Sequence, residues 1–291
     1  DPDLIDKEDT LAKHLQIAGY ETIYGTDEKR FSNILNAYGF DRILGPEMGV
    51  NDFLIGGLSD FPLTNLLINT PVGRYLFPYN YGNRAAAITY EPNTFLQLVQ
   101  IALSKKQDKP LFLAIHLCLS HWPYTWANDQ QGDNFTESLR YQRSVNAVDQ
   151  QLGDLLTILK NDGLLKNAIV VLLSDHGTTV GLPHDRITTL KQYSGDKTRL
   201  KWLPLFSAEP PKLAFKFHSI SKPNLETSYG QGTDVLSLKQ YHVLLAIKGY
   251  GFPIPHHLIQ DRASLLDISP TILELLKLQS LQKADGISFS N

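Results

Sequence analysis

Two stretches of the sequence, 111-LFLAIHLCL-119 and 169-IVVLLS-174, are almost continuously apolar. They lack the alternation of a strand that has one face in water. Strands buried on both faces occur mainly in parallel sheets whose two faces are covered by helices. Two further strands are predicted at 20-YETIY-24 and 243-VLLAI-247. These runs predict a layered α/β protein.

Between these strands the apolar residues recur with the period of an α-helix. The pattern predicts helices at residues 10–18, 94–103, 136–159 and 264–278. Alternation of helix and strand favours a mostly parallel sheet with helices on both faces. No internal repeat or linker divides the sequence, so residues 1–291 are predicted to form a single domain.

Charge and cysteine content exclude several classes of protein. The 291 residues carry a net charge of -3, and the basic residues are scattered, which gives no footprint for nucleic acid or an anionic membrane surface. The single cysteine, Cys118, excludes an intramolecular disulfide, and its apolar surroundings predict a buried thiol. No window reaches the roughly 18 uncharged apolar residues of a membrane span.

The strand at residues 169–174 ends in 174-SDHG-177, which places an acid and an imidazole side by side. In open α/β sheets such residues lie at the carboxyl edge, where ligands bind. Asp175 and His176 are therefore predicted to bind a divalent metal ion. The alternative is a turn in which Asp175 caps the next segment.

A second strand end carries His121, which follows the strand at residues 111–119. The next residues, 122-WPY-124, are expected to form a rigid, partly aromatic wall beside it. His121 is thus suited to hydrogen-bond a substrate anion or to protonate a leaving group. His116, inside the strand, is interpreted as a core histidine.

A third strand end lies within 20-YETIYGTDEKRFSN-33. Lys29 and Arg30 could neutralise an anionic substrate, although a solvated charged turn explains them equally well. If the three strands share one parallel sheet, Gly25, Ser120 and Asp175 should lie at the same edge.

Four segments resemble the sulfatase family of the alkaline phosphatase superfamily, and their order matches that family. They are 19-GYETIYGTDEKRFSNILNAYGFD-41, 115-IHLCLSHWPY-124, 174-SDHG-177 and 265-LLDISPTILELL-276. The first has a form that resembles membrane-anchored bacterial sulfatase-like proteins. The resemblance implies a sulfatase-like α/β fold and a protein of the bacterial inner membrane whose domain lies in the periplasm, or an extracytoplasmic protein. Membrane contact is then expected only through a segment outside this chain.

The resemblance also implies roles for particular residues. Asp175 and His176 would complete a divalent metal site, with zinc or manganese favoured and calcium possible. His121 would be the catalytic histidine that contacts the transferred group. Lys29 and Arg30 would bind the substrate anion, and His184 would be a further ligand or anion contact.

In this family a segment before these motifs supplies acidic metal ligands and the nucleophile. The sequence has no Cys-x-Pro-x-Arg formylglycine context, and Cys118 does not provide one. The chain therefore resembles the C-terminal two-thirds of a catalytic domain, and alone it is expected to be inactive.

Three functions remain open at this point. The first is hydrolysis of sulfate esters on a small molecule, lipid or glycan. The second is transfer of phosphoethanolamine or glycerol-phosphate head groups. The third is a non-catalytic module that binds an anion or a partner protein.

Overall fold

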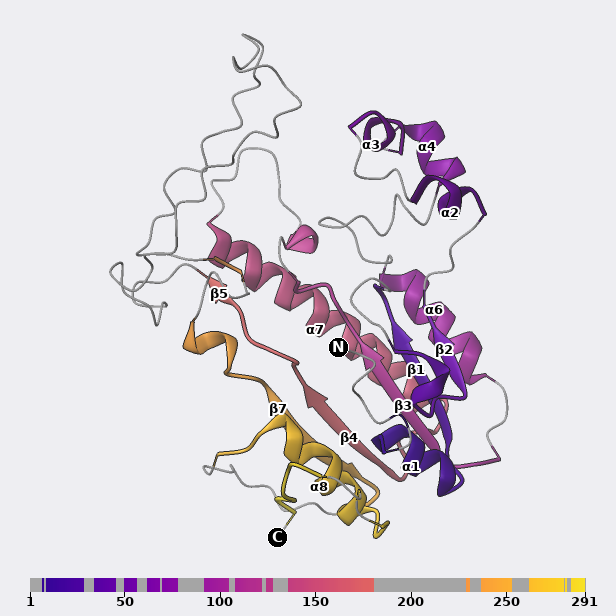
Figure 1. The fold of residues 1–291 in the computed structure, drawn as a ribbon, viewed down its shortest axis with the longest axis vertical. Helices are drawn as coiled ribbons and strands as arrows, with labels where there is room; N and C mark the ends of the chain where they lie inside the picture. The colour runs from indigo at the N-terminus through magenta and orange to yellow at the C-terminus, as the bar shows by residue number, and fades with distance from the viewer. Residues whose placement is uncertain are drawn as a thin grey trace, which may run out of the picture. The chain divides into compact units, whose positions relative to one another are not determined.

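The computed structural model (Figure 1) describes residues 7, 9–28, 34–45, 50–56, 62–68, 70–77, 92–104, 108–121, 124–127, 136–180, 229–230, 237–252, 262–279, 281 and 284–290. The chain forms two compact units. The first contains residues 1–133, 140–169 and 249–291, and the second contains residues 134–139 and 170–248. The single domain predicted from the sequence stays a prediction.

Helices, strands and short 3₁₀ turns (labelled η) alternate along the described residues. In chain order they are α1 (Leu11–Ile17), β1 (Glu21–Thr26), η3 (Asn36–Tyr38), β2 (Arg42–Leu44), α2 (Val50–Gly56), α3 (Pro62–Ile68), α4 (Pro71–Leu76), α6 (Pro92–Leu103), β3 (Leu111–His116), η4 (Thr125–Ala127), α7 (Glu137–Asn161), β4 (Ala168–Leu173), β5 (Thr179–Val180), β6 (Tyr229–Gly230), η5 (Leu238–Gln240), β7 (Leu245–Tyr250), η6 (Leu265–Asp267) and α8 (Ile268–Leu275).

Strand β1 lies between β2 and β3 in a parallel three-stranded sheet (Figure 1). Ile23 is paired with Leu113, and Thr26, the last residue of β1, is paired with His116, the last residue of β3. The parallel pairing predicted for these two strands is confirmed. Residues that follow β1 and β3 therefore emerge at the same edge of this sheet.

Successive residues of β1 and β3 point to opposite faces, as the pleat of a strand requires. On one face Ile23 packs in a buried cluster with α6 and α7, together with Leu113 and Ile115 of β3. On the other face Tyr24 packs with Ala12 of α1 and with Tyr38, Phe40, Phe112 and Ala114. Helices cover both faces of this sheet, so the predicted α/β layering is confirmed.

The third strand predicted for the same sheet has a different neighbour. β4 pairs with β7 in a separate two-stranded sheet, so hydrogen bonds do not join it to β1 and β3 among the described residues. Its residues are half-buried, and Leu173 is exposed. Hydropathy predicts that a segment is a strand, but it does not specify which strand lies beside it.

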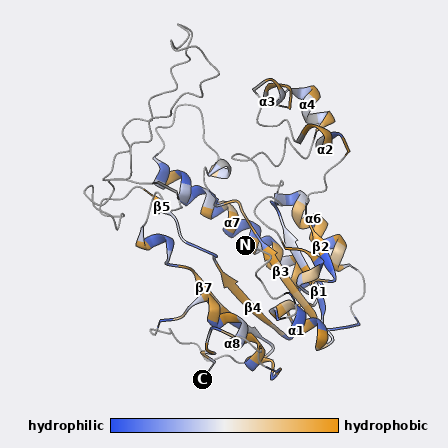
Figure 2. Cartoon of the chain, viewed as in Figure 1, coloured by the Kyte–Doolittle hydropathy of each residue, from blue (hydrophilic) through white to orange (hydrophobic). Residues whose placement is uncertain are grey.

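Local signals set the ends of the helices. The Thr10 hydroxyl accepts a hydrogen bond from the N–H of Lys13 and caps α1. Helix α7 carries hydrophilic and hydrophobic residues along its whole length (Figure 2), as an amphipathic helix does. It ends before Gly163, which has a φ of 76°. None of the described helices has a stretch apolar and long enough to cross a bilayer.

The last predicted helix is divided in two. A 3₁₀ turn, η6, precedes α8, and Ser264 and Asp267 form a capping box around η6. The Asp267 side chain accepts from the N–H of Ser264 at 2.7 Å and from the N–H of Ile287 at 2.8 Å. These bonds tie residues near the end of the chain to the start of α8.

Candidate functional site

The chain leaves β1 directly into two acidic residues, Asp27 and Glu28, which are fully buried. The N–H of Asp27 donates to the carbonyl of His116 at 3.3 Å, and its Oδ1 accepts from the N–H of Cys118 at 2.9 Å. Asp27 Oδ2 is buried without a hydrogen-bond partner among the described residues. Burial raises the pKa of Asp27 to about 7, and the charge of Glu28 raises it further, whereas the hydrogen bonds of Cys118 and the nearby polar amide of Gln151 act to lower it.

In the sequence, residues 27–30 form a charged cluster that predicts no role for Asp27. The structure extends β1 two residues beyond the predicted strand, to Thr26, so Asp27 follows the buried strand directly. Its burial therefore continues that of the strand. Cys118 is predicted inside a strand, but β3 ends at His116, so the cysteine lies in the following turn. Its thiol forms no disulfide and is buried, as predicted.

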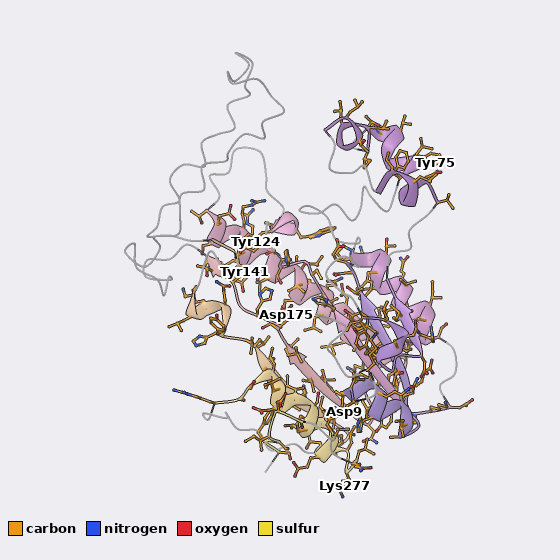
Figure 3. The ribbon with its side chains drawn as sticks, viewed as in Figure 1. Asp9, Tyr75, Tyr124, Tyr141, Asp175 and Lys277 are labelled. Carbon is orange, nitrogen blue, oxygen red and sulfur yellow. The ribbon has the colours of Figure 1, made fainter. Side chains whose placement is uncertain are left out.

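His121 is half-buried in the turn that follows β3. Its N–H donates to the carbonyl of Cys118 at 3.0 Å, and its own carbonyl accepts from the N–H of Tyr124 at 2.9 Å. The expected wall of residues 122–124 has a different arrangement where it is described. Tyr124 is buried, and its ring lies edge-on to that of Tyr141 of α7 at 5.5 Å (Figure 3). It therefore anchors the turn instead of lining an open site.

The Ser-Asp-His-Gly motif follows β4 (Figure 3) and is fixed by the residues at its two ends. Ser174 is bonded to Leu244 twice, because its N–H donates to the Leu244 carbonyl at 3.1 Å and its hydroxyl accepts from the Leu244 N–H at 2.9 Å. The N–H of Gly177 donates to the carbonyl of Gln240 at 2.9 Å. The side chains of Asp175 and His176 remain 68% and 40% exposed.

The hydrogen bonds of His176 favour one tautomer of its ring. Nδ1 lies 2.9 Å from the carbonyl oxygen of Gly177, which can only accept, so Nδ1 carries the proton. Nε2 then has a free lone pair, and it lies 3.8 Å from Asp175 Oδ1. This is the arrangement of a metal-binding histidine, whose second nitrogen donates to a carbonyl group.

The Asp175 and His176 pair fits a divalent metal ion. Nitrogen and oxygen ligands at about 2.0 to 2.2 Å from a tetrahedral zinc ion lie roughly 3.4 Å apart. Nε2 and Oδ1 lie 3.8 Å apart, and Oδ1 also accepts the backbone N–H of His176 at 2.9 Å. No group of three or more His, Cys, Asp or Glu residues suited to a metal is formed within the part of the chain that the structure describes.

The structure places three of the six predicted site residues. His121 belongs to the first unit, and Asp175 and His176 belong to the second. Lys29, Arg30 and His184 lie outside the described residues. The roles predicted for all six stay predictions, and so does the shared edge of Gly25, Ser120 and Asp175.

The first unit holds a parallel sheet covered by helices, which defines an α/β fold, and the second unit carries the Asp-His pair of the candidate metal site. The model of the family named Sulfatase matches residues 2–278. The chain therefore belongs to the sulfatase family, as its motifs predicted. The chain is 32% identical to an endo-4-O-sulfatase of Bacteroides thetaiotaomicron over a match that covers 25% of this chain and 19% of that protein.

Solved structures also resemble the fold. The lipoteichoic acid synthase LtaP from Listeria monocytogenes matches 97% of this chain and 56% of its own, with a TM-score of 0.52 and 15% identity. A protein in the alkaline phosphatase superfamily from Vibrio parahaemolyticus matches 99% of this chain and 53% of its own, with a TM-score of 0.49 and 16% identity. The chain spans about half the length of these two proteins.

Proposed function

We propose that the protein is a metal-dependent hydrolase of sulfate esters, with Asp175 and His176 as metal ligands. One observation carries the proposal: the Gly177 carbonyl holds the Nδ1 proton of His176, so Nε2 is open beside Asp175 Oδ1. Membership of the sulfatase family supports the reaction class. The whole protein's substrate is a sulfated small molecule, lipid or glycan.

The donor set favours a transition metal. Imidazole nitrogen beside a carboxylate oxygen suits zinc or manganese, whereas calcium prefers oxygen ligands alone. When bound, the ion polarises the oxygens of the ester group and stabilises an oxyanion nucleophile. The protein holds the two ligands in place through the backbone bonds of Ser174 and Gly177.

The remaining predicted residues act on the anion. His121 hydrogen-bonds an oxygen of the transferred group or gives a proton to the leaving group. Lys29 and Arg30 offset the negative charge of the ester, Arg30 through two parallel hydrogen bonds. His184 contributes a further ligand or an anion contact.

Metal binding tests the proposal directly. We expect zinc and manganese to bind the full-length protein, measured by isothermal titration calorimetry at constant pH. Asp175→Asn and His176→Ala should each weaken binding at least tenfold, because each removes one ligand. His242→Ala is the matched control, since His242 is an exposed histidine on the segment that packs against the motif.

Turnover separates the candidate reactions. Release of the phenol from an aryl sulfate, dependent on the metal and lost in Asp175→Asn, supports the hydrolase. Turnover of an aryl phosphodiester alone would favour the head-group transferase instead. Unchanged metal affinity in both ligand variants would contradict the metal site and leave a non-catalytic module.

A further inference from the structure

Asp27 occupies a particular place in the first unit. β1 ends at Thr26, and the N–H of Asp27 still bonds to the last carbonyl of β3 at 3.3 Å. Its side chain then accepts the N–H of Cys118, two residues beyond β3, at 2.9 Å. The carboxylate thus accepts the next hydrogen bond after the backbone pairing of β1 and β3 ends. It fixes the first residues of the turn after β3.

That turn continues to His121 and Tyr124 through successive backbone bonds. The carbonyl of Cys118 accepts the N–H of His121 at 3.0 Å, and the carbonyl of His121 accepts the N–H of Tyr124 at 2.9 Å. Tyr124 has a φ of 61°, which is uncommon for a non-glycine residue. Its buried ring, packed on Tyr141, maintains that conformation. The backbone of His121 is therefore held from both sides.

We propose that Asp27 is a positioning residue that sets the place of His121 through the backbone N–H of Cys118. The proposal rests on the proposed function only in taking His121 as the group that contacts the substrate. A displacement of about 1 Å in a substrate-contacting group can lower the rate about 100-fold. Fixing the turn from the core therefore has a direct consequence for the reaction.

The choice of an acid at this position supports a role beyond packing. An asparagine oxygen would accept the same N–H without the cost of burying a carboxyl group. Asp27 Oδ2 has no partner among the described residues, and the buried amide of Gln151 lies beside the carboxylate without meeting hydrogen-bond geometry. An ionised carboxylate accepts a shorter and stronger hydrogen bond than a neutral one. The hold on the turn therefore depends on the protonation of Asp27.

Several titratable groups surround Asp27. Glu28 follows it on the chain, and its charge disfavours ionisation of Asp27. The Cys118 thiol favours the charged form of Asp27, and the ring of His116 lies 3.7 Å from that thiol. Gln151 of α7 adds no charge. With the pKa of Asp27 near 7, the bond to Cys118 should strengthen as the pH rises from 6 to 8.

Nuclear magnetic resonance on the full-length protein tests this without any substrate. Selective ¹⁵N labelling of cysteine and histidine makes the backbone N–H groups of Cys118 and His121 visible, assigned with Cys118→Ser and His121→Gln. We expect both signals to shift together with an inflection near pH 7. Asp27→Asn should remove that inflection and keep the His121 signal near its low-pH position, because the amide oxygen remains as an acceptor but carries no charge. Asp27→Ala should displace both signals.

Matched controls separate positioning from general stability. Asp149→Asn changes an exposed acid on α7 and should leave both signals and their pH dependence unchanged. If Asp27→Ala does not fold, the pH dependence of the two signals in Asp27→Asn tests the proposal. An inflection near pH 7 that persists in this variant overturns the proposal. A His121 signal that does not follow that of Cys118 also overturns it.

In turnover, Asp27→Ala should lower kcat about 100-fold with a smaller change in KM. If no ester is turned over, the proposed function fails, while the resonance result still decides the role of Asp27.

Discussion

Gly177 shows how one residue serves the candidate metal site through packing. A Cβ atom there would overlap the carbonyl oxygen of Lys239 and lie 2.7 Å from that of His242. The glycine lets the backbone of residues 239–242 approach the motif closely. Its carbonyl also accepts the Nδ1 proton of His176. The sequence indicated a glycine beside two predicted ligands, and the close approach of residues 239–242 gives its physical reason.

Two other glycines give opposite predictions for alanine. Gly39 has a φ of 94°, and a Cβ atom would lie 2.5 Å from the Cα of Lys13 in α1. Gly39→Ala should lower the free energy of unfolding by more than about 1 kcal/mol. Gly153 lies at an exposed position of α7, where an added Cβ atom would meet nothing within 4 Å. Gly153→Ala should raise the free energy of unfolding by about 0.5 to 1 kcal/mol.

Urea unfolding of the two variants, followed by far-ultraviolet circular dichroism, measures both changes. A similar stability for both variants would contradict the left-handed conformation of Gly39. It would also contradict the close packing of η3 and α1, which that conformation permits.

At the scale of elements, α6 stabilises the sheet through one face only. Leu96 is 5% exposed and belongs to the cluster that packs on β1 and β3, whereas Ile101 on the same helix is 68% exposed. Leu96→Ala should lower the free energy of unfolding by about 2 to 5 kcal/mol, because it leaves a cavity. Ile101→Ala should change it by less than about 0.5 kcal/mol. Equal losses in thermal or urea unfolding would show that α6 does not pack by the face described.

The sequence predicted the limits of helices and strands better than it predicted which strands pair with each other. Helices α1, α6 and α7 and strands β1, β3 and β4 lie within one to three residues of their predicted limits, because apolar periodicity and capping residues act locally. β7 begins two residues later and ends three residues later than its apolar run. The pairing of β4 with β7 was not predicted, since hydropathy does not encode which strand is adjacent.

For the candidate site too, the sequence predicted the features that depend on local pattern and missed those that depend on packing. Asp175, His176 and His121 follow apolar strands, which is a signal in the sequence itself. The buried Asp27 and Gln151 were missed, because their burial depends on packing between β1 and α7, which lie more than 100 residues apart along the chain. The tautomer of His176 depends on the local path of the chain through Gly177, and residue types alone do not specify it.

For the whole molecule, the buried and the surface acids have opposite effects on stability. Asp41 accepts from the N–H and hydroxyl of Thr22 and from Gln16, and these bonds lower its pKa against the opposing effect of desolvation. The pKa of Asp267 is lowered by the N–H groups of Ile287 and Ser264. Their contribution is present above about pH 4 and is lost as the pH falls further. Asp27 acts in the other direction, because its pKa is raised.

We predict that Asp27→Asn becomes more stable relative to the natural protein as the pH rises from 4 to 8. In the unfolded chain Asp27 ionises near the ordinary aspartate pKa of 3.8, but in the folded protein burial holds its pKa at about 7. The folded state therefore binds more protons over this interval, and its stability falls with rising pH. The full shift corresponds to roughly 4 kcal/mol. Asparagine does not titrate, so the stability of the variant does not fall with rising pH for this reason.

Urea unfolding at intervals of half a pH unit, with a chelator present so that metal binding adds no pH dependence of its own, measures the difference between variant and natural protein. Asp149→Asn, which replaces an exposed acid of α7, is the control for the loss of one carboxyl group. Asp41→Asn should give a stability loss that is complete above about pH 4 and disappears in acid. A difference for Asp27→Asn that does not grow between pH 4 and 8 would mean that this carboxylate is ionised in the core at neutral pH. Its bond to the turn of His121 would then be at full strength throughout that range.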